Sequence, residues 1–418
     1  MLKAVVGLQF GDEGKGKFVD FLSQSSGHIV RFNGGANAGH TVQFGHKRAF
    51  FSQIPATLNK GKLYIAHGAL ISPEILIREL NFLKQNKIDS DIHIDPRCHV
   101  VLPIHAELNK ASEDYKGKNK IGSVGKGIGA CFEDKSNRHG IRLIDLTNKD
   151  TLRDKLELLW GIRQKQIEYV FDGKLELAFN TVLDKYASYG EMIAPYFAFN
   201  NELIQQALDN DEDVLLETSQ ATFLDNAFGT YPYTVAYQTL VQNCFSLIGI
   251  PAREIDAIGV LKAYMIRVGN GPFPTEIHTS LADEIRVKGN EYGTVSNRPR
   301  RCGWLDLNLI KHAVKLNGIK KLAITNVDVL CELESIKVAT GYYRQGKPVC
   351  VNDALMSFEQ IEPDYQSFES WPALNASHYT YRDLPQQLRT YLAFIEDYVG
   401  VPIAYISYGP DREQTITL

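Results

Sequence analysis

A glycine-rich segment near the amino terminus, GDEGKGK at residues 11–17, is the feature that most constrains how this chain can fold. It follows a short apolar run at residues 4–10, which predicts a buried strand. From Gly14 onward, the spacing of apolar residues predicts a helix. In such a strand–turn–helix unit, glycines let backbone N–H groups approach an anion, and the helix amino terminus favours negative charge. The segment therefore predicts a phosphate site in an α/β fold.

This segment departs from an ordinary P-loop at one functional position. Gly11 to Lys17 fit the pattern GxxxxGK, but Phe18 stands where Ser or Thr would bind magnesium. Asp12 is then the obvious oxygen donor for a hard cation. A carboxylate among phosphates repels them unless it binds metal or takes up a proton. Glycine-rich turns are common in structural roles, but the two lysines, the two acids and the preceding strand favour an enzyme that transfers the terminal phosphoryl group of a nucleotide.

A second loop of small residues, NGGANAGH at residues 33–40, follows the next expected strand at residues 28–32. We expect it to lie beside the first loop, one strand later in the chain. It offers Asn37 as an amide and His40 as an acid or a charge stabiliser. Taken alone, His40 would more often be a structural histidine, and its pairing with the first loop favours a functional role.

Further strands are expected at residues 214–216, 257–260, 322–325 and 403–407, with helical patterns between them. Strands that alternate with helices favour a central, mainly parallel sheet flanked by helices on both faces. With its glycine-rich turn, this α/β architecture is P-loop-like and related to that of GTPases.

One helix is expected to open at Ser72-Pro73-Glu74, with a capping hydroxyl, a proline in the first position and an acid in the first turn. The range of about 147–210 is helix-rich, and we interpret it as an insertion rather than a separate domain. The 418 residues, 44% of them hydrophobic, are expected to form one large domain over residues 1–418.

Composition excludes several classes of partner. The formal net charge of −4 means that the chain lacks the excess of positive charge that binds nucleic acid or an anionic membrane. A phosphate site must therefore be a local pocket. No stretch approaches the roughly 18 apolar residues of a membrane span, and no signal peptide is expected. The six cysteines have no spacing typical of zinc, and free thiols in a reducing compartment are expected. We therefore expect a soluble cytoplasmic protein. The cysteines are Cys98, Cys131, Cys244, Cys302, Cys331 and Cys350.

The two loops, in GLQFGDEGKGKFVDFL and VRFNGGANAGHTV, resemble those of the adenylosuccinate synthetase family. The segments IGSVGKGIGACFEDK, FLDNAFGTYPY, LKAYMIRVGNGPFPTE, RPRRCGWLD and GPDREQTI agree in order, so the resemblance covers nearly the whole chain. It implies a homodimer with a mainly parallel sheet. It also implies a ligase that forms adenylosuccinate from inosine monophosphate (IMP) and L-aspartate. In that reaction GTP phosphorylates the 6-oxygen of IMP, and the aspartate amine then displaces the phosphate.

The resemblance assigns the catalytic roles. Asp12 matches the base that removes the N1 proton and also touches Mg²⁺, and Gly39 matches a backbone carbonyl on that ion. His40 matches the group that stabilises developing charge, and Lys15 matches the cation near the transferred phosphate. The implied purine monophosphate site consists of Asp12, Glu13, Gly14, Lys15, Asn37, Ala38, Gly39, His40, Val124, Arg138, Gln220, Val235 and Arg298, with Arg138 reaching the neighbouring subunit's site.

Two further substrate sites follow from the same resemblance. Arg298 and Arg300 lie in a run of cations, which is more often a solvated patch, but Pro299 and the preceding YGTVSN indicate a loop. Arg298 would hold the carboxylate of aspartate, and Arg300 would reach the nucleotide. The implied aspartate site is Val268, Thr294, Val295, Ser296, Asn297, Arg298 and Arg300. The implied GTP site is Gly11, Asp12, Glu13, Gly14, Lys15, Gly16, Lys17, Gly39, His40, Thr41, Arg300, Asn326, Val327, Asp328, Ser407, Tyr408 and Gly409.

Several positions depart from the family's pattern. Val124 and Val235 replace residues that give hydroxyl hydrogen bonds to the monophosphate, and Val295 lacks a hydroxyl in the aspartate loop. Asn326 replaces the lysine that covers the guanine base, and Tyr408 replaces a small residue beside it, whereas the guanine acceptor Asp328 is retained. Besides an ordinary synthetase, these changes leave open a paralogue that acts on another purine monophosphate such as deoxyguanylate, with ATP as a possible donor. A catalytically silent GTP-binding regulator is a third alternative, against which the retained Asp12 and His40 argue.

Overall fold

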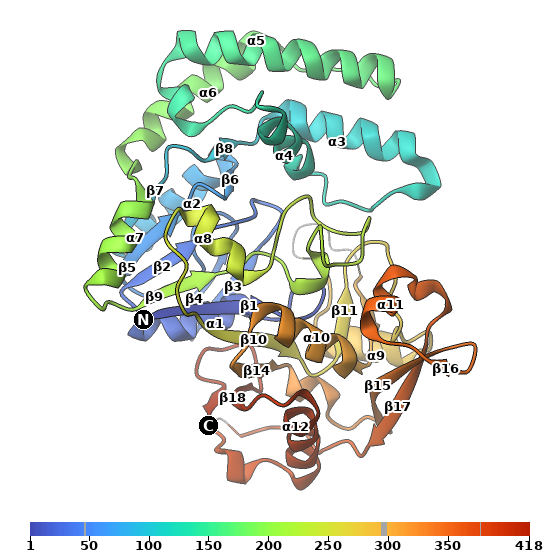
Figure 1. The fold of residues 1–418 in the computed structure, drawn as a ribbon. Helices are drawn as coiled ribbons and strands as arrows, with labels where there is room; N and C mark the ends of the chain where they lie inside the picture. Colours follow the sequence, from blue (N-terminus) through green and yellow to red (C-terminus); the bar gives the residue numbers. More distant parts are fainter. Residues whose placement is uncertain (46, 294–298, 377) are drawn as a thin grey trace.

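The computed structural model of the chain describes residues 1–45, 47–293, 299–376 and 378–418. Its centre is a sheet with helices on both faces (Figure 1). Within those ranges the sheet has nine strands in the order β19-β18-β14-β10-β1-β9-β2-β5-β7. All neighbours run parallel except β19, which is antiparallel to β18. This arrangement confirms the expected α/β fold. The strands are β1 (Leu2–Gly7), β2 (His28–Arg31), β5 (Gly61–Ile65), β7 (Ser90–Ile94), β9 (Val214–Glu217), β10 (Asp256–Lys262), β14 (Lys321–Thr325), β18 (Ile403–Ser407) and β19 (Thr415–Thr417).

Both faces of this sheet are apolar. In β1, Val6 belongs to the core on one face and Val5 to the core on the other, and Leu216 and Leu215 of β9 divide in the same way. Because both faces are covered, the central strands are nearly continuous apolar runs. One face packs against α7 (Asn200–Asp209), α8 (Cys244–Ile248), α9 (Leu281–Lys288), α10 (Leu307–Asn317) and α12 (Gln386–Val399), and the other packs first against α1 (Lys15–Leu22) and α2 (Pro73–Gln85).

A further layer of helices lies beyond the second face, at the top of Figure 1. Leu156 of α5 and Leu183 of α6 belong to the same apolar core as Ile29 of β2, so this layer shares its core with the sheet. The range of about 147–210 is helical, as expected, but its last helix, α7, packs beside β9 instead of in this layer. The layer consists of α3 (Pro103–Lys116), α4 (Ile128–Asn137), α5 (Lys149–Lys165) and α6 (Phe179–Ile193).

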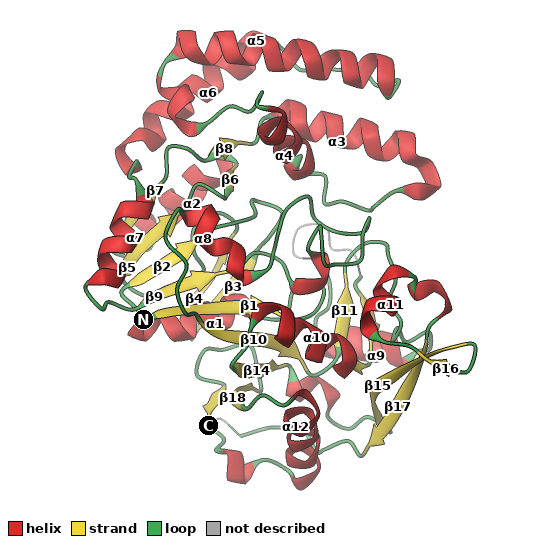
Figure 2. Cartoon of the chain, viewed as in Figure 1, coloured by secondary structure: helices red, strands yellow, loops and turns green. Residues whose placement is uncertain are grey.

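Small sheets and one short helix complete the described chain (Figure 2). The strands β3–β4, β6–β8 and β11–β12 form three two-stranded sheets, and β13, β15, β16 and β17 form a separate four-stranded sheet. Their bounds are β3 (His40–Phe44), β4 (Lys47–Phe51), β6 (Leu70–Ile71), β8 (His99–Val100), β11 (Met265–Arg267), β12 (Arg301–Gly303), β13 (Leu305–Asp306), β15 (Ile336–Arg344), β16 (Lys347–Pro348) and β17 (Glu362–Phe368); the helix is α11 (Val351–Met356).

Two local expectations are wrong. The first strand ends at Gly7, not at Phe10, because after Leu8 donates to the Val260 carbonyl (3.0 Å) the backbone turns to the side chain of Glu13. Ser72 does precede α2, and its carbonyl accepts the N–H groups of Ile75 and Leu76 as an N-cap residue does, but its hydroxyl makes no capping hydrogen bond.

The cysteines are free thiols; five of them are buried, in agreement with the expectation of buried or partly buried thiols, whereas Cys350 is exposed. None of the helices that the structure describes is long and apolar enough to cross a membrane.

Candidate active site

The carboxyl ends of the parallel strands meet at one edge of the sheet, and the loops that follow them carry most of the predicted site residues. β1 ends at Gly7 before the glycine-rich turn, and β2 ends at Arg31 before the loop at residues 33–40. β9 ends at Glu217 and β14 at Thr325. Ligands of open α/β sheets bind outside the carboxyl ends of the strands. The fold thus brings to one edge segments that lie far apart in the sequence.

A fully buried carboxylate shapes the glycine-rich turn. Glu13 Oε1 accepts the backbone N–H groups of Gln9 (3.1 Å) and Gly11 (2.9 Å), and Oε2 accepts from Lys15 Nζ (2.6 Å). Glycine is needed at the end of β1, because a Cβ on Gly7 would lie 2.9 Å from the backbone carbonyl oxygen of Gln220 and 2.6 Å from Glu13 Oε2. The side chain of Glu13 therefore holds the loop and Lys15 in place, and is closed off from a ligand.

Asp12 points out of the same turn and is partly exposed. Its backbone has φ 58°, a left-handed conformation that Asp and Asn adopt more readily than most residues. Its Oδ2 lies 2.7 Å from Arg300 Nη2, and Arg300 Nη1 donates to Glu291 Oε2 (2.8 Å). Burial alone would lower the pKa of Arg300, but Asp12 and Glu291 raise it. Arg300 is thus a fully charged bridge between the two carboxylates.

The second anchor of Arg300 is itself deeply embedded. Glu291 is fully buried, and its Oε1 accepts from Lys262 Nζ and from the hydroxyl of Tyr264 (2.5 Å). Lys262 ends β10, so this network connects the position of Arg300 to the central sheet. A buried carboxylate with two cations and a hydroxyl around it has its charge and its lone pairs satisfied.

The second loop places His40 against another buried carboxylate. His40 Nδ1 is hydrogen-bonded to Oε1 of Glu217, whose Oε2 accepts the Ala56 N–H (2.8 Å), and Arg31 Nη1 lies 3.7 Å from Glu217 Oε1. Burial alone would raise the pKa of Glu217, but His40, Arg31 and the Ala56 N–H lower it below its ordinary value. The carboxylate is therefore ionised and fixes the orientation of the imidazole.

The two loops are in direct contact, as expected. A Cβ on Gly16 would lie 2.7 Å from His40 Cβ, so the start of α1 can approach the second loop only because this residue is glycine.

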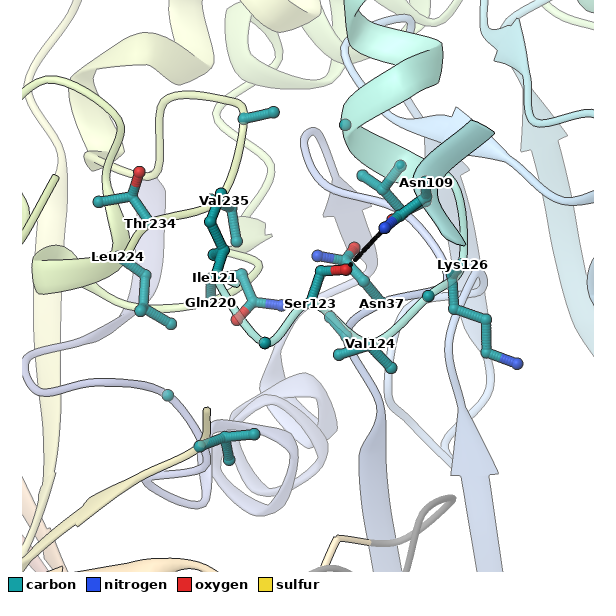
Figure 3. A pocket seen from close by; sticks show the side chains of 18 of the residues that line it. Asn37, Asn109, Ile121, Ser123, Val124, Lys126, Gln220, Leu224, Thr234 and Val235 are labelled. Carbon is teal, nitrogen blue, oxygen red and sulfur yellow. Dashed lines mark hydrogen bonds between the residues drawn. The ribbon is translucent and has the colours of Figure 1, made fainter. Parts of the chain in front are cut away.

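One cavity of about 660 Å³ lies over these loops. Its wall includes Asp12, Lys15 and His40, so the three predicted catalytic side chains share one space. Figure 3 shows part of its lining, in which Asn37, Gln220 and Val124 are labelled. Predicted site residues that line the cavity are Gly11, Asp12, Lys15, Asn37, Ala38, Gly39, His40, Val124, Gln220, Val235, Val268 and Arg300.

The helical layer closes the far side of this cavity. Asn109 Nδ2 on α3 donates to Ser123 Oγ (2.8 Å, Figure 3), and Glu113 Oε2 accepts the Gly122 N–H (2.9 Å). These bonds attach the loop that carries Val124 to α3. The resemblance had assigned only Val124 on this side, although Asn109 and Glu113 also line the cavity.

Lys17 points to a different side of the glycine-rich turn and is not part of the cavity wall. Its Nζ donates to Ser407 Oγ (2.7 Å) and to the carbonyl oxygens of Gly409 (2.8 Å) and Gln414 (2.9 Å). Burial lowers the pKa of Lys17 to about 7, although Asp328 and Asp411 raise it. Lys17 thus connects the turn to the end of β18.

The predicted base-recognition residues lie near this lysine. Asn326 follows β14 in a left-handed conformation (φ 57°), and burial raises the pKa of Asp328 although Lys17 and Lys262 lower it. Tyr408 is buried, and its ring packs edge-on against that of Tyr379 at 5.2 Å.

The remaining predicted residues divide into three groups. Arg138 is exposed at the end of α4, outside the cavity wall. Gly14, Thr41 and Val327 support the loops but do not line the cavity. Thr294, Val295, Ser296, Asn297 and Arg298, which carry most of the predicted aspartate site, lie outside the described residues.

The donor set for a metal is small. Among the described residues there is no cluster of three or more His, Cys, Asp or Glu side chains suited to hold a metal. Asp12 and Gly39 line one cavity, and an oxygen from each is the kind of ligand that Mg²⁺ prefers when phosphates and waters supply the rest. The residues present therefore fit a metal that is bound mainly through its substrates.

Reasoning from sequence missed the supporting shell of this site. Glu217 and Glu291 were not predicted, and neither were their partners Arg31, Lys262 and Tyr264. The available signal was a carboxylate or a cation directly at the end of an apolar strand, as in Glu217 and Lys262, where only a paired charge is tolerated.

Comparison with known proteins identifies relatives over the full length. The family model described as adenylosuccinate synthetase matches residues 4–416. The chain is 64% identical to "Adenylosuccinate synthetase 1" of Photorhabdus laumondii over 418 residues, which is 100% of both chains. It is 40% identical to the adenylosuccinate synthetase of Borrelia duttonii, over 99% of this chain and 97% of the relative.

Solved structures agree with this relationship. The fully ligated adenylosuccinate synthetase from Plasmodium falciparum is similar with a TM-score of 0.93 and 31% identity, over 100% of this chain and 99% of that chain. The succinoaminodeoxyadenylate synthetase of cyanophage S-2L is similar with a TM-score of 0.62 and 18% identity, over 100% of this chain and 96% of that chain. The second likeness concerns the fold alone.

We expect Glu217 to be the carboxylate on which this edge of the sheet depends most. Glu217→Ala leaves Arg31 and His40 without their buried counter-charge, and should lower the free energy of unfolding by about 3–5 kcal/mol. Glu217→Gln, which keeps an acceptor for the Ala56 N–H, should cost less. Urea unfolding measures both.

The pH dependence of stability gives a second readout. Because the pKa of Glu217 is lowered from its ordinary value of 4.5, its ionised form stabilises the fold above that pH, and this contribution is lost as the pH falls through the lowered value. Glu217→Gln should flatten the acid limb of the stability curve. The matched control is Glu212, whose half-exposed side chain is paired with His28. Glu212→Gln should change the free energy of unfolding by less than about 1 kcal/mol. Equal effects of the two Gln substitutions would contradict the prediction.

Proposed function

The chain belongs to the adenylosuccinate synthetase family and forms adenylosuccinate from IMP and L-aspartate with GTP as the energy donor; from that premise, we propose which of its side chains perform each part of the reaction. The observation that carries the proposal is the meeting of Asp12, Lys15 and His40 in one cavity that also contains Asn37 and Gln220. The cavity suits a purine monophosphate, and the glycine-rich turn forms its floor.

In the first step, the 6-oxygen of IMP attacks the γ-phosphorus of GTP and GDP leaves. A lactam oxygen is a weak nucleophile until N1 loses its proton, and Asp12 is the carboxylate placed to accept that proton. Lys15 and His40 face the same space and stabilise the negative charge on the transferred phosphoryl group. The pairing of Lys15 with Glu13 and of His40 with Glu217 holds both groups in position before the substrates arrive.

In the second step, the amine of aspartate attacks C6 of the purine and the phosphate on the 6-oxygen leaves. Val268 and Arg300 line the cavity from the side that the aspartate would enter. Residues 294–298 are proposed to complete this subsite through Arg298, because a guanidinium fork matches a carboxylate.

Arg300 has to change partners for this chemistry. In the described structure its Nη2 neutralises Asp12, which is the same carboxylate that must accept a proton. Glu291 keeps Arg300 at the cavity wall when Asp12 is released. The freed guanidinium can then serve the negatively charged substrates.

The family uses a divalent metal, and we propose Mg²⁺, held by the carboxylate of Asp12 and the carbonyl of Gly39. When bound, Mg²⁺ neutralises phosphate charge and orients the phosphates. Its small protein donor set agrees with the reluctance of Mg²⁺ to give up its waters.

The nucleotide is proposed to lie on the Lys17 side of the turn. Backbone N–H groups from Gly11 to Lys17 would hold its phosphates, and Asp328 would accept from N1 and the 2-amino group of guanine. Asn326 and Tyr408 would flank the base, with Ser407 and Gly409 supplying the nearby backbone.

We also propose that residues 1–418 form one cytoplasmic domain that acts as a homodimer. The shared apolar core of the sheet and the helical layer supports the single domain, with the helix-rich insertion at about 147–210. Arg138 is exposed and outside the cavity of its own chain, which suits a role in a neighbouring site.

The identity of the monophosphate is tested directly with purified protein, GTP, L-aspartate and Mg²⁺. The cyanophage relative was solved with dGMP and with dATP as an energy donor, but its 18% identity carries only the fold. We expect IMP with GTP to give the highest kcat/KM in a panel that includes deoxyguanylate and ATP. Higher activity with deoxyguanylate would reassign the substrate.

Asp12→Asn tests the assignment of the base. Asn tolerates the left-handed backbone at this position, so the fold should be retained. The amide cannot accept the N1 proton, and kcat/KM should fall at least about 1000-fold. The matched control is Asp283→Asn. Asp283 is exposed and forms an ion pair with Arg286, and this substitution should leave activity unchanged. Near-normal turnover by Asp12→Asn would refute the role.

Nucleotide binding should take up a proton through Lys17. With a pKa of about 7, its amine is mostly neutral at pH 8, and a bound phosphate raises that pKa. Calorimetric titration of GDP at pH 8, in two buffers that differ in ionisation enthalpy, measures the uptake per nucleotide. Lys17→Arg is the control, because an always-charged guanidinium has no proton to gain. The same uptake in both proteins would contradict the prediction.

A further inference from the structure

Tyr237 lies behind the wall of the cavity and does not line it. Its side chain is 5% exposed and stacks on Phe132 with ring centres 4.9 Å apart. Leu70, Ile128 and Cys131 belong to the same small apolar cluster. A tyrosine in such a place contributes apolar area from its ring and requires a polar partner for its hydroxyl.

The partners of that hydroxyl are two side chains of the cavity. Asn37 Nδ2 donates to it at 3.4 Å, and the side chain of Gln220 lies close enough to lower its pKa. Both amides line the cavity and lie close to each other in Figure 3. We propose that Tyr237 is a positioning residue for the purine monophosphate, acting through Asn37 and Gln220, whose amides its hydroxyl holds in the cavity wall.

The side-chain amide of Asn37 has hydrogen-bonding capacity that a substrate could use. Its Oδ1 is buried and has no hydrogen-bond partner, so one end of the amide is fixed by Tyr237 and the other is unsatisfied. A hydroxyl can donate as well as accept. Tyr237 can therefore satisfy either end of the amide, and Asn37 can present an NH₂ group to a phosphate or a carbonyl to a hydroxyl of the ribose.

Gln220 depends on the same hydroxyl for a different reason. Its backbone has φ 64°, which costs energy for a residue other than glycine and persists only where the surroundings determine it. Gln220 lines the cavity, and the neighbouring hydroxyl of Tyr237 limits where its amide can lie. Burial raises the pKa of Tyr237 to about 12, although Asn37 and Gln220 lower it, so the hydroxyl keeps its proton throughout the working pH range.

This inference rests on the proposed assignment of Asn37 and Gln220 to the monophosphate. Removing the hydroxyl alone, with Tyr237→Phe, should raise the KM for IMP by about 3- to 10-fold, which corresponds to the loss of one or two ordinary hydrogen bonds. The values of kcat and of KM for GTP should stay within about 2-fold, because Lys15, Lys17 and their partners are not touched. The dissociation constant of IMP, measured without GTP, should rise by the same factor as the KM.

Tyr186→Phe is the matched control. Its hydroxyl is also buried and donates to a backbone carbonyl, that of Val101 (3.1 Å), but Tyr186 does not line the cavity or contact a residue assigned to a substrate. Loss of this hydroxyl should leave the KM for IMP unchanged, even if thermal stability falls. Equal effects of the two substitutions on KM would show that Tyr237 has only a structural role, and would overturn the inference.

A double-mutant cycle with Asn37→Ala separates action through the amide from a direct effect. If Tyr237 acts through Asn37, Tyr237→Phe should add clearly less to the KM for IMP in the Asn37→Ala background than in the wild type. Fully additive effects would refute the coupling. If the wild-type protein turned over no IMP at all, the proposed function would fail instead, and the two failures are therefore distinguishable.

Discussion

Three wholly buried glutamates at the carboxyl edge of the sheet determine where the chemistry of this protein can take place. Glu13, Glu217 and Glu291 are each 0% exposed, and each is surrounded by a cation and by N–H or O–H donors. A buried carboxylate without such partners would be strongly destabilising. Their partners are Lys15 for Glu13, His40 for Glu217, and Arg300 for Glu291. The groups that we propose to act on the substrate are thus the counter-charges of carboxylates that the fold has to neutralise.

This arrangement explains how a cavity with few charged side chains can still hold those side chains in a fixed orientation. A lysine or arginine on a flexible stem loses rotamer freedom when it binds a phosphate. Lys15 and Arg300 have already lost most of that freedom through their pairs with Glu13 and Glu291. The cost is met during folding, and the substrate meets charges whose positions are already fixed. Asp12 differs from them, because it is paired with Arg300, and its proposed role as a base requires that pair to open.

The sequence predicted the parts of this site that leave a local pattern. The glycine-rich turn, with Asp12 and Lys15, and the loop with His40 were found because glycines and charged side chains follow apolar runs. The parallel sheet followed from the alternation of strands and helices. Glu291 left no such pattern, since its partners Lys262 and Tyr264 come from another strand end and only the fold brings them together. The end of the first strand was misplaced because Phe10 continues the apolar run while the backbone N–H groups turn to Glu13.

The two lysines of the glycine-rich turn have different partners, which agrees with the two substrate sites proposed on either side of the turn. Lys15 is paired with a buried carboxylate and faces the cavity, so its charge is present before any ligand binds. Lys17 faces away from the cavity, donates to a hydroxyl and two carbonyls, and has a pKa lowered to about 7. A lysine whose hydrogen-bond partners are all neutral gains more from an arriving phosphate than a lysine that is hydrogen-bonded to a carboxylate, and the latter is better suited to hold a fixed position. The difference in partners therefore agrees with the proposed roles, in which Lys17 binds the nucleotide and Lys15 stabilises the transferred phosphoryl group.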